Sequence, residues 1–204
     1  TTRRVIEGDA LVRSGRWTGW SPTQLLGSEV TGKTLGIIGM GRIGQAVAHR
    51  AAGFRMPVLY HTRQQPDSSS LPSEWKCRPL QALLEEADIV TIHAPLTPVT
   101  HHLIGSRELA WMRPTAFLIN TARGPIVDEA SLVDALKRGT IAGAGLDVYE
   151  EEPTLHPELT ALKQVVLLPH LGSATLHARV QMGLVCLKNI EAVLGGRSTP
   201  NQVT

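Results

Sequence analysis

Short apolar runs alternate along the chain with longer segments in which apolar residues recur at helical spacing. Six runs have the length and composition of buried strands, at residues 34–38, 57–60, 88–93, 116–120, 143–148 and 165–168. The helix before the fifth run could be capped by Asp128 and ended by Gly139. Strands that alternate with helices predict a parallel sheet with both faces covered. We therefore expect an α/β fold, a doubly wound parallel sheet of the Rossmann type, with strand order 3-2-1-4-5-6.

The two ends of the chain have patterns of their own. Residues 2–13 fit a helix with one apolar side, and residues 15–32 read as a loop that carries Trp17 and Trp20. Large aromatic side chains in such a loop more often serve as packing or oligomer contacts than as ligand platforms. A last helix is predicted over residues 173–194. Its apolar stripe comprises Leu176, Val180, Leu184, Leu187, Ile190 and Leu194.

Composition and charge exclude several classes of protein. Of the 204 residues, 42% are hydrophobic and 19% are charged, which excludes disordered and fibrous chains. A formal net charge of +2, with no basic cluster longer than Arg3-Arg4, argues against nucleic-acid binding. No apolar run approaches the length of a membrane span, so we expect a cytoplasmic protein. Cys77 and Cys186 lack metal-ligand spacing and are expected to be free thiols, and no metal site is predicted.

The first apolar run leads directly into three glycines, Gly39, Gly41 and Gly44. The spacing Gly-x-Gly-x-x-Gly between a strand and a helix is what a dinucleotide-binding turn requires. Gly39 permits the tight turn, Gly41 lets a pyrophosphate approach the backbone, and Gly44 lets helix and strand pack closely. The next helix, roughly residues 42–52, would direct its unpaired N–H groups and positive dipole end toward the phosphates. The alternative is an ordinary glycine-rich turn.

Polar residues follow three of the later strands, at the edge where a doubly wound sheet binds its ligand. Arg123 follows the fourth strand, Asp147 ends the fifth with glutamates at 150–152 just beyond, and His170 follows the sixth. Each has a structural alternative as a surface ion pair, a capping carboxylate or a loop histidine. Their convergence at one edge favours a functional site.

These residue types suit hydride transfer to a 2-keto acid. Arg123 can hold a substrate carboxylate through two parallel hydrogen bonds. His170, as imidazolium, can donate a proton to the carbonyl oxygen while hydride reaches the carbon. A carboxylate is then needed to orient the histidine and to favour its charged form.

Six motifs occur in order along almost the whole chain. They read Gly-Met-Gly-Arg-Ile-Gly from Gly39, His-Ala-Pro-Leu-Thr-Pro-Val-Thr from His93, Asn-Thr-Ala-Arg-Gly from Asn120, Gly-Leu-Asp-Val from Gly145, Glu-Glu-Pro from Glu151 and Pro-His-Leu-Gly-Ser-Ala-Thr from Pro169. Together they resemble the D-isomer-specific 2-hydroxyacid dehydrogenases, and most closely the glyoxylate and hydroxypyruvate reductase branch. The resemblance implies that Arg123 binds substrate, that His170 is the acid/base, and that Glu152 is its partner.

NAD-dependent members of that family end the second strand with an acidic residue that binds the ribose hydroxyls. This chain instead reads Tyr-His-Thr-Arg at 60–63, and Asp67 comes too late. His61 or Arg63 could meet a 2′-phosphate, which resembles the NADP-using branch. We therefore expect NADP as the cofactor. NAD is the alternative, in which case Arg63 is a solvated loop residue.

The expected cofactor contacts combine the glycine turn, the end of the second strand and the positions that the resemblance implies. They are Gly39, Gly41, Arg42, Ile43, Gly44, His61, Thr62, Arg63, Pro95, Thr100, Thr121, Asp147, His170 and Gly172.

The family builds its substrate domain from an N-terminal segment and the last helix, and that N-terminal segment is missing from this sequence. We therefore expect a fragment that binds cofactor but turns over slowly, because no wall closes the site against water. Residues 1–174 would form the dinucleotide-binding domain, and the leading helix and loop at 1–20 could contact the second subunit of a homodimer. Residues 175–204 would form a C-terminal helix and tail that return toward the substrate domain.

Two other functions stay open. One is an NAD-linked dehydrogenase of the phosphoglycerate type, because the missing segment would shape the substrate pocket. The other is a non-catalytic, dinucleotide-sensing binding protein, because some transcriptional corepressors resemble this family. Turnover with NADPH and glyoxylate or hydroxypyruvate separates an enzyme from a sensor.

Overall fold

The computed structural model describes residues 1–63 and 71–202. Asp67, the acidic residue beyond the second predicted strand, lies outside the described residues. The chain divides into two compact units, Thr1–Pro169 and His170–Thr204.

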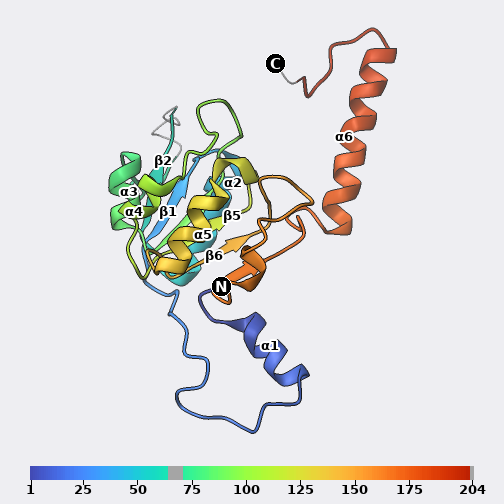
Figure 1. Cartoon of the computed structure of the whole chain (residues 1–204). Coiled ribbons are helices and arrows are strands. Elements are labelled where there is room, and N and C mark those ends of the chain that lie inside the picture. Colours follow the sequence, from blue (N-terminus) through green and yellow to red (C-terminus); the bar gives the residue numbers. More distant parts are fainter. Residues whose placement is uncertain (64–70, 203–204) are drawn as a thin grey trace. The chain divides into compact units, whose positions relative to one another are not determined.

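The first unit is built on a parallel sheet (Figure 1). Within the described residues the sheet has seven strands in the order β3-β2-β1-β4-β5-β6-β7. Ile38 of β1 lies between His61 of β2 and Ile92 of β4, and Asn120 of β5 lies opposite Leu146 of β6. The carboxyl ends of these strands therefore form one edge, as the predicted doubly wound fold requires. The strands are β1 (Leu35–Ile38), β2 (Val58–His61), β3 (Lys76–Cys77), β4 (Ile89–Ile92), β5 (Phe117–Asn120), β6 (Gly143–Leu146) and β7 (Val165–Leu167).

The six predicted strands are all present, but the prediction missed β3. This strand is only two residues long and carries the exposed Lys76, so it gives no apolar run. It pairs with β2 and occupies the edge position. The expected order is therefore wrong for the six strands as predicted. It places the third predicted strand at the edge of the sheet, but that strand is β4, which lies beside β1. With β3 included, the first six strands follow the order 3-2-1-4-5-6.

Helices connect these strands. Asp128 caps α5, with Ser131 N donating to its Oδ1 at 2.9 Å, and Gly139 ends that helix in the left-handed region at φ 68°, so both predictions are confirmed. The short helix α4 was not predicted, because six residues give too little periodicity. The helices are α1 (Val5–Arg13), α2 (Arg42–Ala51), α3 (Leu80–Glu86), α4 (Ser106–Trp111), α5 (Glu129–Arg138) and α6 (Leu176–Leu194), with 3₁₀ turns η1 (Ala52–Phe54), η3 (Gly124–Ile126) and η4 (Leu159–Ala161).

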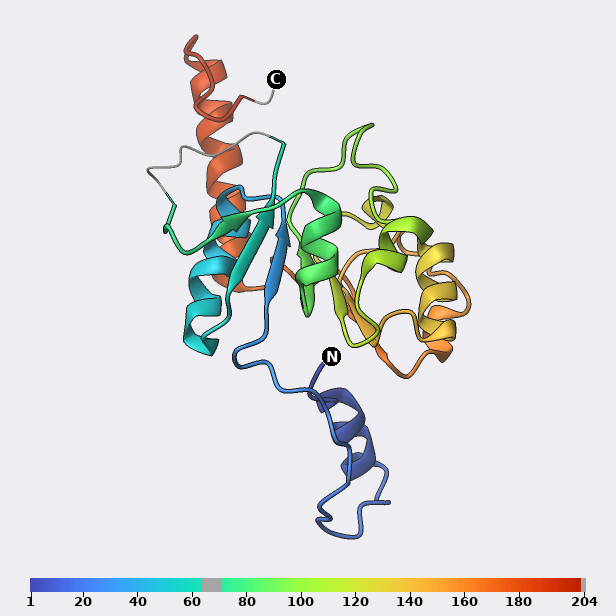
Figure 2. The same ribbon diagram turned by 90° about the vertical axis from the view of Figure 1, so that its left-hand side faces the viewer.

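Helices cover both faces of the sheet. Neighbouring residues of β1 point to opposite faces, and each face of β1 meets a different helix. A Cβ at Gly36 would lie 2.7 Å from Leu83 of α3, whereas Ile37 lies against Gly44 of α2. Figure 2 shows α2 and α3 on opposite sides of β1. All four residues of β1 are buried, which places this strand in the centre of the apolar core.

The N-terminal segment is largely exposed. None of the residues of α1, Val5–Arg13, is buried, and residues 14–33 contain no helix or strand. Trp20 is 81% exposed and Leu26 is 65% exposed. The predicted helix and loop are thus confirmed, but the apolar side of the helix lies at the surface of this chain.

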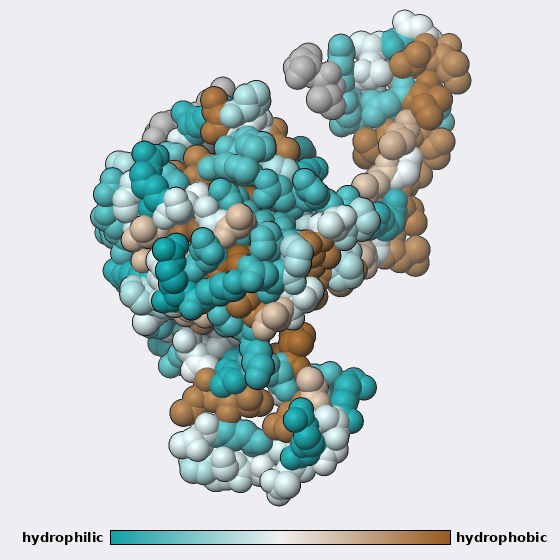
Figure 3. Space-filling model, viewed as in Figure 1, coloured by the Kyte–Doolittle hydropathy of each residue, from teal (hydrophilic) through white to brown (hydrophobic). Residues whose placement is uncertain are grey.

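The second unit consists mainly of α6, which confirms the predicted last helix. Thr175 caps it, with Ala178 N donating to Thr175 Oγ1 at 3.1 Å. Within Leu176–Leu194 only Ala192 is buried, and the predicted apolar stripe is exposed, as the brown surface along this helix shows (Figure 3). Among the described residues, no helix is both long and apolar enough to cross a membrane.

Candidate functional site

A cavity of about 450 Å³ opens at the carboxyl ends of β1, β2 and β4. This is the position at which a doubly wound sheet binds a nucleotide, because the crossovers diverge there. Many of the predicted cofactor contacts come together in its wall. These are Gly39, Gly41, His61, Thr62, Arg63, Pro95 and Thr100.

A different steric feature accounts for glycine at each of the three positions of the turn. Gly39 has φ 100°, and a Cβ there would lie 2.6 Å from Ala94 N. A Cβ at Gly44 would lie 2.1 Å from Gly39 O, so α2 can pack this closely on β1 only with glycine at this position. A Cβ at Gly41 would meet nothing within 4 Å. The space above Gly41 is open to a ligand, as a pyrophosphate site requires.

The beginning of α2 fits a phosphate group. Gly41 is the N-cap residue and has no side chain to satisfy the first N–H groups of the helix. Arg42 and Ile43 begin the helix and are exposed, and Ile43 is 67% exposed. Unpaired N–H groups at the positive end of the helix dipole favour an anion at this position.

The end of β2 forms another part of the cavity wall. His61 Nδ1 is hydrogen-bonded to the main-chain oxygen of Arg78 at 3.1 Å, which fixes the orientation of the ring. When Nδ1 donates, Nε2 can accept from a hydroxyl in the neutral ring or donate to a phosphate in the charged ring. Arg63 is exposed at the same wall.

His93 lines the cavity from the end of β4, and the sequence interpretation did not single it out as a cofactor contact. Burial lowers the pKa of His93, because a charged imidazolium is poorly solvated there. Its Nε2 is hydrogen-bonded to Thr91 Oγ1 at 3.0 Å. His93 therefore contributes a neutral ring to the cavity.

Thr100 shapes the loop that follows β4. Its hydroxyl donates to Pro95 O at 2.7 Å and accepts from Thr97 N at 2.8 Å. Thr100 is 5% exposed, so these bonds hold a compact turn that presents Pro95 to the cavity.

Arg123 lies in a turn that Asn120 organises at the end of β5. Asn120 is 1% exposed, its Nδ2 donates to Arg123 O at 3.0 Å, and Ala122 N donates to its Oδ1 at 3.1 Å. The guanidinium donates to Ala122 O at 2.6 Å and is otherwise at the surface. Thr121 is exposed in the same turn.

Gly124 joins this turn to the segment that carries Glu152. A Cβ at Gly124 would lie 1.7 Å from Tyr149 O and 2.5 Å from Glu150 N. The two backbones therefore touch, and no other residue type fits between them without a shift. The glycine is part of a quoted motif, but the sequence alone does not reveal its contact.

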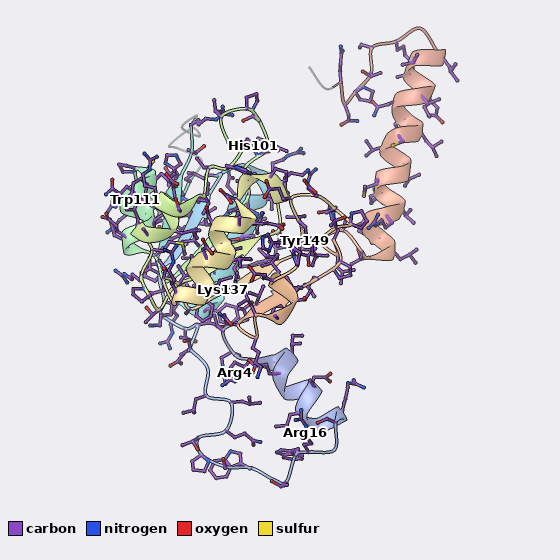
Figure 4. All side chains as sticks on the ribbon, in the orientation of Figure 1. Arg4, Arg16, His101, Trp111, Lys137 and Tyr149 are labelled. Carbon is purple, nitrogen blue, oxygen red and sulfur yellow. The ribbon has the colours of Figure 1, made fainter. Side chains whose placement is uncertain are left out.

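The segment after β6 is held by buried groups. Asp147 is 4% exposed at the end of β6, and its N–H donates to Asn120 O at 3.0 Å. Tyr149 N donates to Glu152 Oε1 at 3.0 Å, and Tyr149 OH donates to Leu168 O at 2.8 Å. Burial raises the pKa of the Tyr149 phenol, so it stays a neutral donor. Tyr149 of this segment is labelled in Figure 4.

His170 and Gly172 belong to the second unit. His170 has a left-handed backbone with φ 54°. Its pairing with Glu152 stays a prediction, as do its contact and that of Gly172 with the cofactor. Among the described residues, no group of three His, Cys, Asp or Glu side chains is arranged to hold a metal ion.

Comparison with known proteins gives the family. The description "D-isomer specific 2-hydroxyacid dehydrogenase, NAD binding domain" matches residues 1–172. The chain belongs to this family. The resemblance drawn from the motifs is thereby confirmed, and the matched part is a domain that binds a nicotinamide dinucleotide.

Individual relatives agree with this assignment. The chain is 50% identical to a glyoxylate reductase of Thermococcus gammatolerans, which it matches over its whole length and over 62% of the relative. A crystal structure of a protein from Thermus thermophilus is 49% identical with a TM-score of 0.92, over all of this chain and 64% of that one. An NADPH-dependent glyoxylate/hydroxypyruvate reductase from Sinorhizobium meliloti is 34% identical with a TM-score of 0.90, over 100% and 63%. The chain thus spans about 62% of the length of the curated relative.

Proposed function

We propose that the full-length protein reduces a small 2-keto acid, glyoxylate or hydroxypyruvate, to the 2-hydroxy acid with NADPH, in the cytoplasm. The observation that carries this proposal is the contact of Gly124 with Tyr149 and Glu150. This contact joins the turn that carries the Arg123 guanidinium to the segment that carries the Glu152 carboxylate. Both follow strands at the carboxyl edge of the sheet, the edge proposed to bind the cofactor. The name glyoxylate reductase among relatives near 50% identity supports the substrate class.

Different residues of this chain have different roles in the reaction. The N–H groups at the beginning of α2 bind the pyrophosphate above Gly41. Arg123 holds the substrate carboxylate and so fixes the neighbouring carbonyl group. When bound, the reduced nicotinamide supplies the hydride that adds to the carbonyl carbon. His170 donates a proton to the carbonyl oxygen, becomes neutral, and regains a proton from solvent. Glu152 favours the protonated ring.

Turnover tests the reaction. The full-length protein with NADPH and glyoxylate or hydroxypyruvate should consume many equivalents of NADPH and form the matching 2-hydroxy acid. A screen of small 2-keto acids with NADPH and NADH separates this function from a phosphoglycerate-type dehydrogenase. Cofactor binding without turnover on any of these acids would instead support a dinucleotide-sensing protein.

We propose that NADPH is preferred over NADH because Arg63, and His61 when protonated, face the 2′-phosphate. Arg63→Asp removes an attractive charge and adds a repulsive one. Since Arg63 is exposed, we expect the ratio of kcat/KM values for NADPH and NADH to fall by about 10-fold. The measurement is steady-state kinetics with both cofactors at one ionic strength.

The matched control is Arg16→Asp, which makes the same charge change in the exposed N-terminal loop (Figure 4). It should leave the ratio unchanged. A wild-type protein that uses NADH better, together with an unaltered ratio in Arg63→Asp, would exclude the proposed 2′-phosphate contact.

The exposed apolar residues at both ends support two proposals about assembly. We propose that α1 and the loop with Trp17, Trp20 and Leu26 contact a second copy of the chain in a homodimer, because this much apolar surface is unfavourable in water. We also propose that the apolar stripe of α6 packs in the substrate domain of the full-length protein.

A further inference from the structure

Two carboxylates, one at the beginning of α5 and one in the segment after β6, each accept hydrogen bonds from the main chain of the other's segment. Glu129 is the first residue of α5 and is 6% exposed. Its Oε1 accepts from Glu150 N at 2.7 Å, and its Oε2 accepts from His156 N at 3.2 Å. In return, Glu150 Oε2 accepts from Glu129 N at 3.2 Å. The two glutamates therefore bind the backbone of each other's segment.

The second oxygen of Glu150 extends this arrangement to the loop after β4. His102 Nε2 donates to Glu150 Oε1 at 2.5 Å. His102 N in turn donates to Pro125 O at 2.8 Å, in the turn that follows Arg123. Glu150 thus connects the segment after β6 to the loop that presents Pro95 and Thr100 to the cofactor cavity.

Both carboxylates lie at the beginning of α5. Glu129 lies in its first turn, and Glu150 accepts from an N–H of the same turn. Negative charge is stabilised at this end of a helix. A carboxylate offers two acceptor oxygens, so it can accept from two separate N–H donors at once, as Glu129 does.

Glu152 lies between the two amides that Glu129 binds. Glu150 and His156 mark the ends of the segment, and Glu129 holds both ends to one rigid helix. Inside the segment, Glu152 Oε1 accepts from Tyr149 N, so its position follows that of the backbone. A shift of the segment therefore moves the carboxylate.

We propose that Glu129 is a positioning residue for the reaction, because it fixes the backbone segment that presents Glu152 to His170. The inference rests on the proposed function, in which Glu152 is the partner of His170. Glu129 itself is committed to two main-chain N–H groups and acts through the position of Glu152.

The test is Glu129→Gln in the full-length protein. Glutamine keeps one acceptor oxygen, but its NH₂ group opposes the second N–H donor, so one end of the segment is released. We expect kcat to fall roughly 10-fold, because small errors in the position of a functional group lower rates strongly, with cofactor Kd unchanged. The pH profile of reductive kcat/KM should move to lower pH, as in Glu152→Gln but less. Hydrogen exchange of residues 149–157 should become faster.

The matched control is Glu108→Gln. Glu108 is also a buried carboxylate in the first turn of a helix, 7% exposed, and it accepts from Gly105 N at 3.2 Å and from Arg107 Nε at 2.9 Å. The same chemical change there should lower stability without altering the pH profile or the exchange of residues 149–157. If Glu129→Gln does not fold, Glu129→Asp keeps the charge but cannot reach both amides, and the same measurements apply.

The outcomes separate the inference from the function on which it rests. If Glu152→Gln moves the pH profile but the Glu129 variant behaves like Glu108→Gln, Glu129 has no positioning role. If Glu152→Gln itself leaves the profile unchanged, the proposed partnership of Glu152 and His170 fails and the inference fails with it. A parallel movement in both variants, with faster exchange only in the Glu129 variant, supports the inference.

Discussion

Arg123→Gln is expected to lower kcat/KM for glyoxylate by roughly 10²- to 10³-fold in the full-length protein. A guanidinium can hold a carboxylate through two parallel, charge-assisted hydrogen bonds, and glutamine offers one neutral donor group. Losing the two charge-assisted hydrogen bonds removes about 3 to 4 kcal/mol of stabilisation in the transition state. Because the carboxylate also orients the carbonyl group, kcat should fall as well as KM rise.

The structure indicates that Arg123→Gln should change substrate binding without disturbing the fold. The fold uses the main chain of Arg123 through Asn120, whereas, within residues 1–63 and 71–202, its guanidinium donates only to the adjacent Ala122 O. Unfolding temperature and cofactor Kd should therefore stay near those of the wild type. Arg138→Gln is the control, because Arg138 is also an exposed arginine whose side chain donates to a main-chain oxygen, that of Asp134 at 3.3 Å. A kcat/KM of Arg123→Gln within about 3-fold of that control would exclude Arg123 as the carboxylate clamp.

Glu152→Gln is expected to lower the reductive kcat/KM at pH 7 by about 100-fold, within the usual contribution of general acid catalysis. A carboxylate beside an imidazole stabilises the protonated ring, and reduction uses that form. In the variant this stabilisation is lost, so the reductive rate should fall off at lower pH than in the wild type. The oxidative direction, which uses the neutral ring, extends to lower pH instead.

The pH dependence of kcat/KM in both directions measures this effect. Glutamine keeps the size of the side chain and an oxygen that can accept from Tyr149 N, so the local fold is conserved. Glu151→Gln is the control, because it changes the exposed neighbouring carboxylate. Movement of the two profiles in the opposite sense would contradict the model. Unchanged profiles, with chemistry shown to be rate-limiting, would point to Glu150 or Glu151 as the partner.

Periodicity predicted the longer elements and missed the shortest ones. β1 is apolar and fully buried, so its pattern is strong, and α5 carries both a cap residue and a terminal glycine. β3 and α4 are short and are stabilised by their neighbours in the fold. Their own residues carry too little signal, and the strand order was therefore wrong until β3 was known.

The sequence indicated candidate residues of the site, but it did not indicate which other residues each of them contacts. Gly39, Gly41 and Gly44 were assigned different roles from spacing alone, and each has a matching steric environment. In contrast, no local pattern indicates that Gly124 touches Tyr149, because the two are far apart in sequence and meet through the sheet.

By itself, the sequence determined the alternation of strands and helices, the glycine turn and the family, because each depends on residues that are close along the chain. Only the tertiary structure decided which groups are committed to holding the fold. It partly buries His93, which lowers the pKa of that ring, and it binds both oxygens of Glu129 to the segment around Glu152. The physical reason is that burial and hydrogen-bond partners depend on which distant segments the sheet brings together, and a carboxylate reads the same in the sequence whether it binds a ligand or two backbone amides.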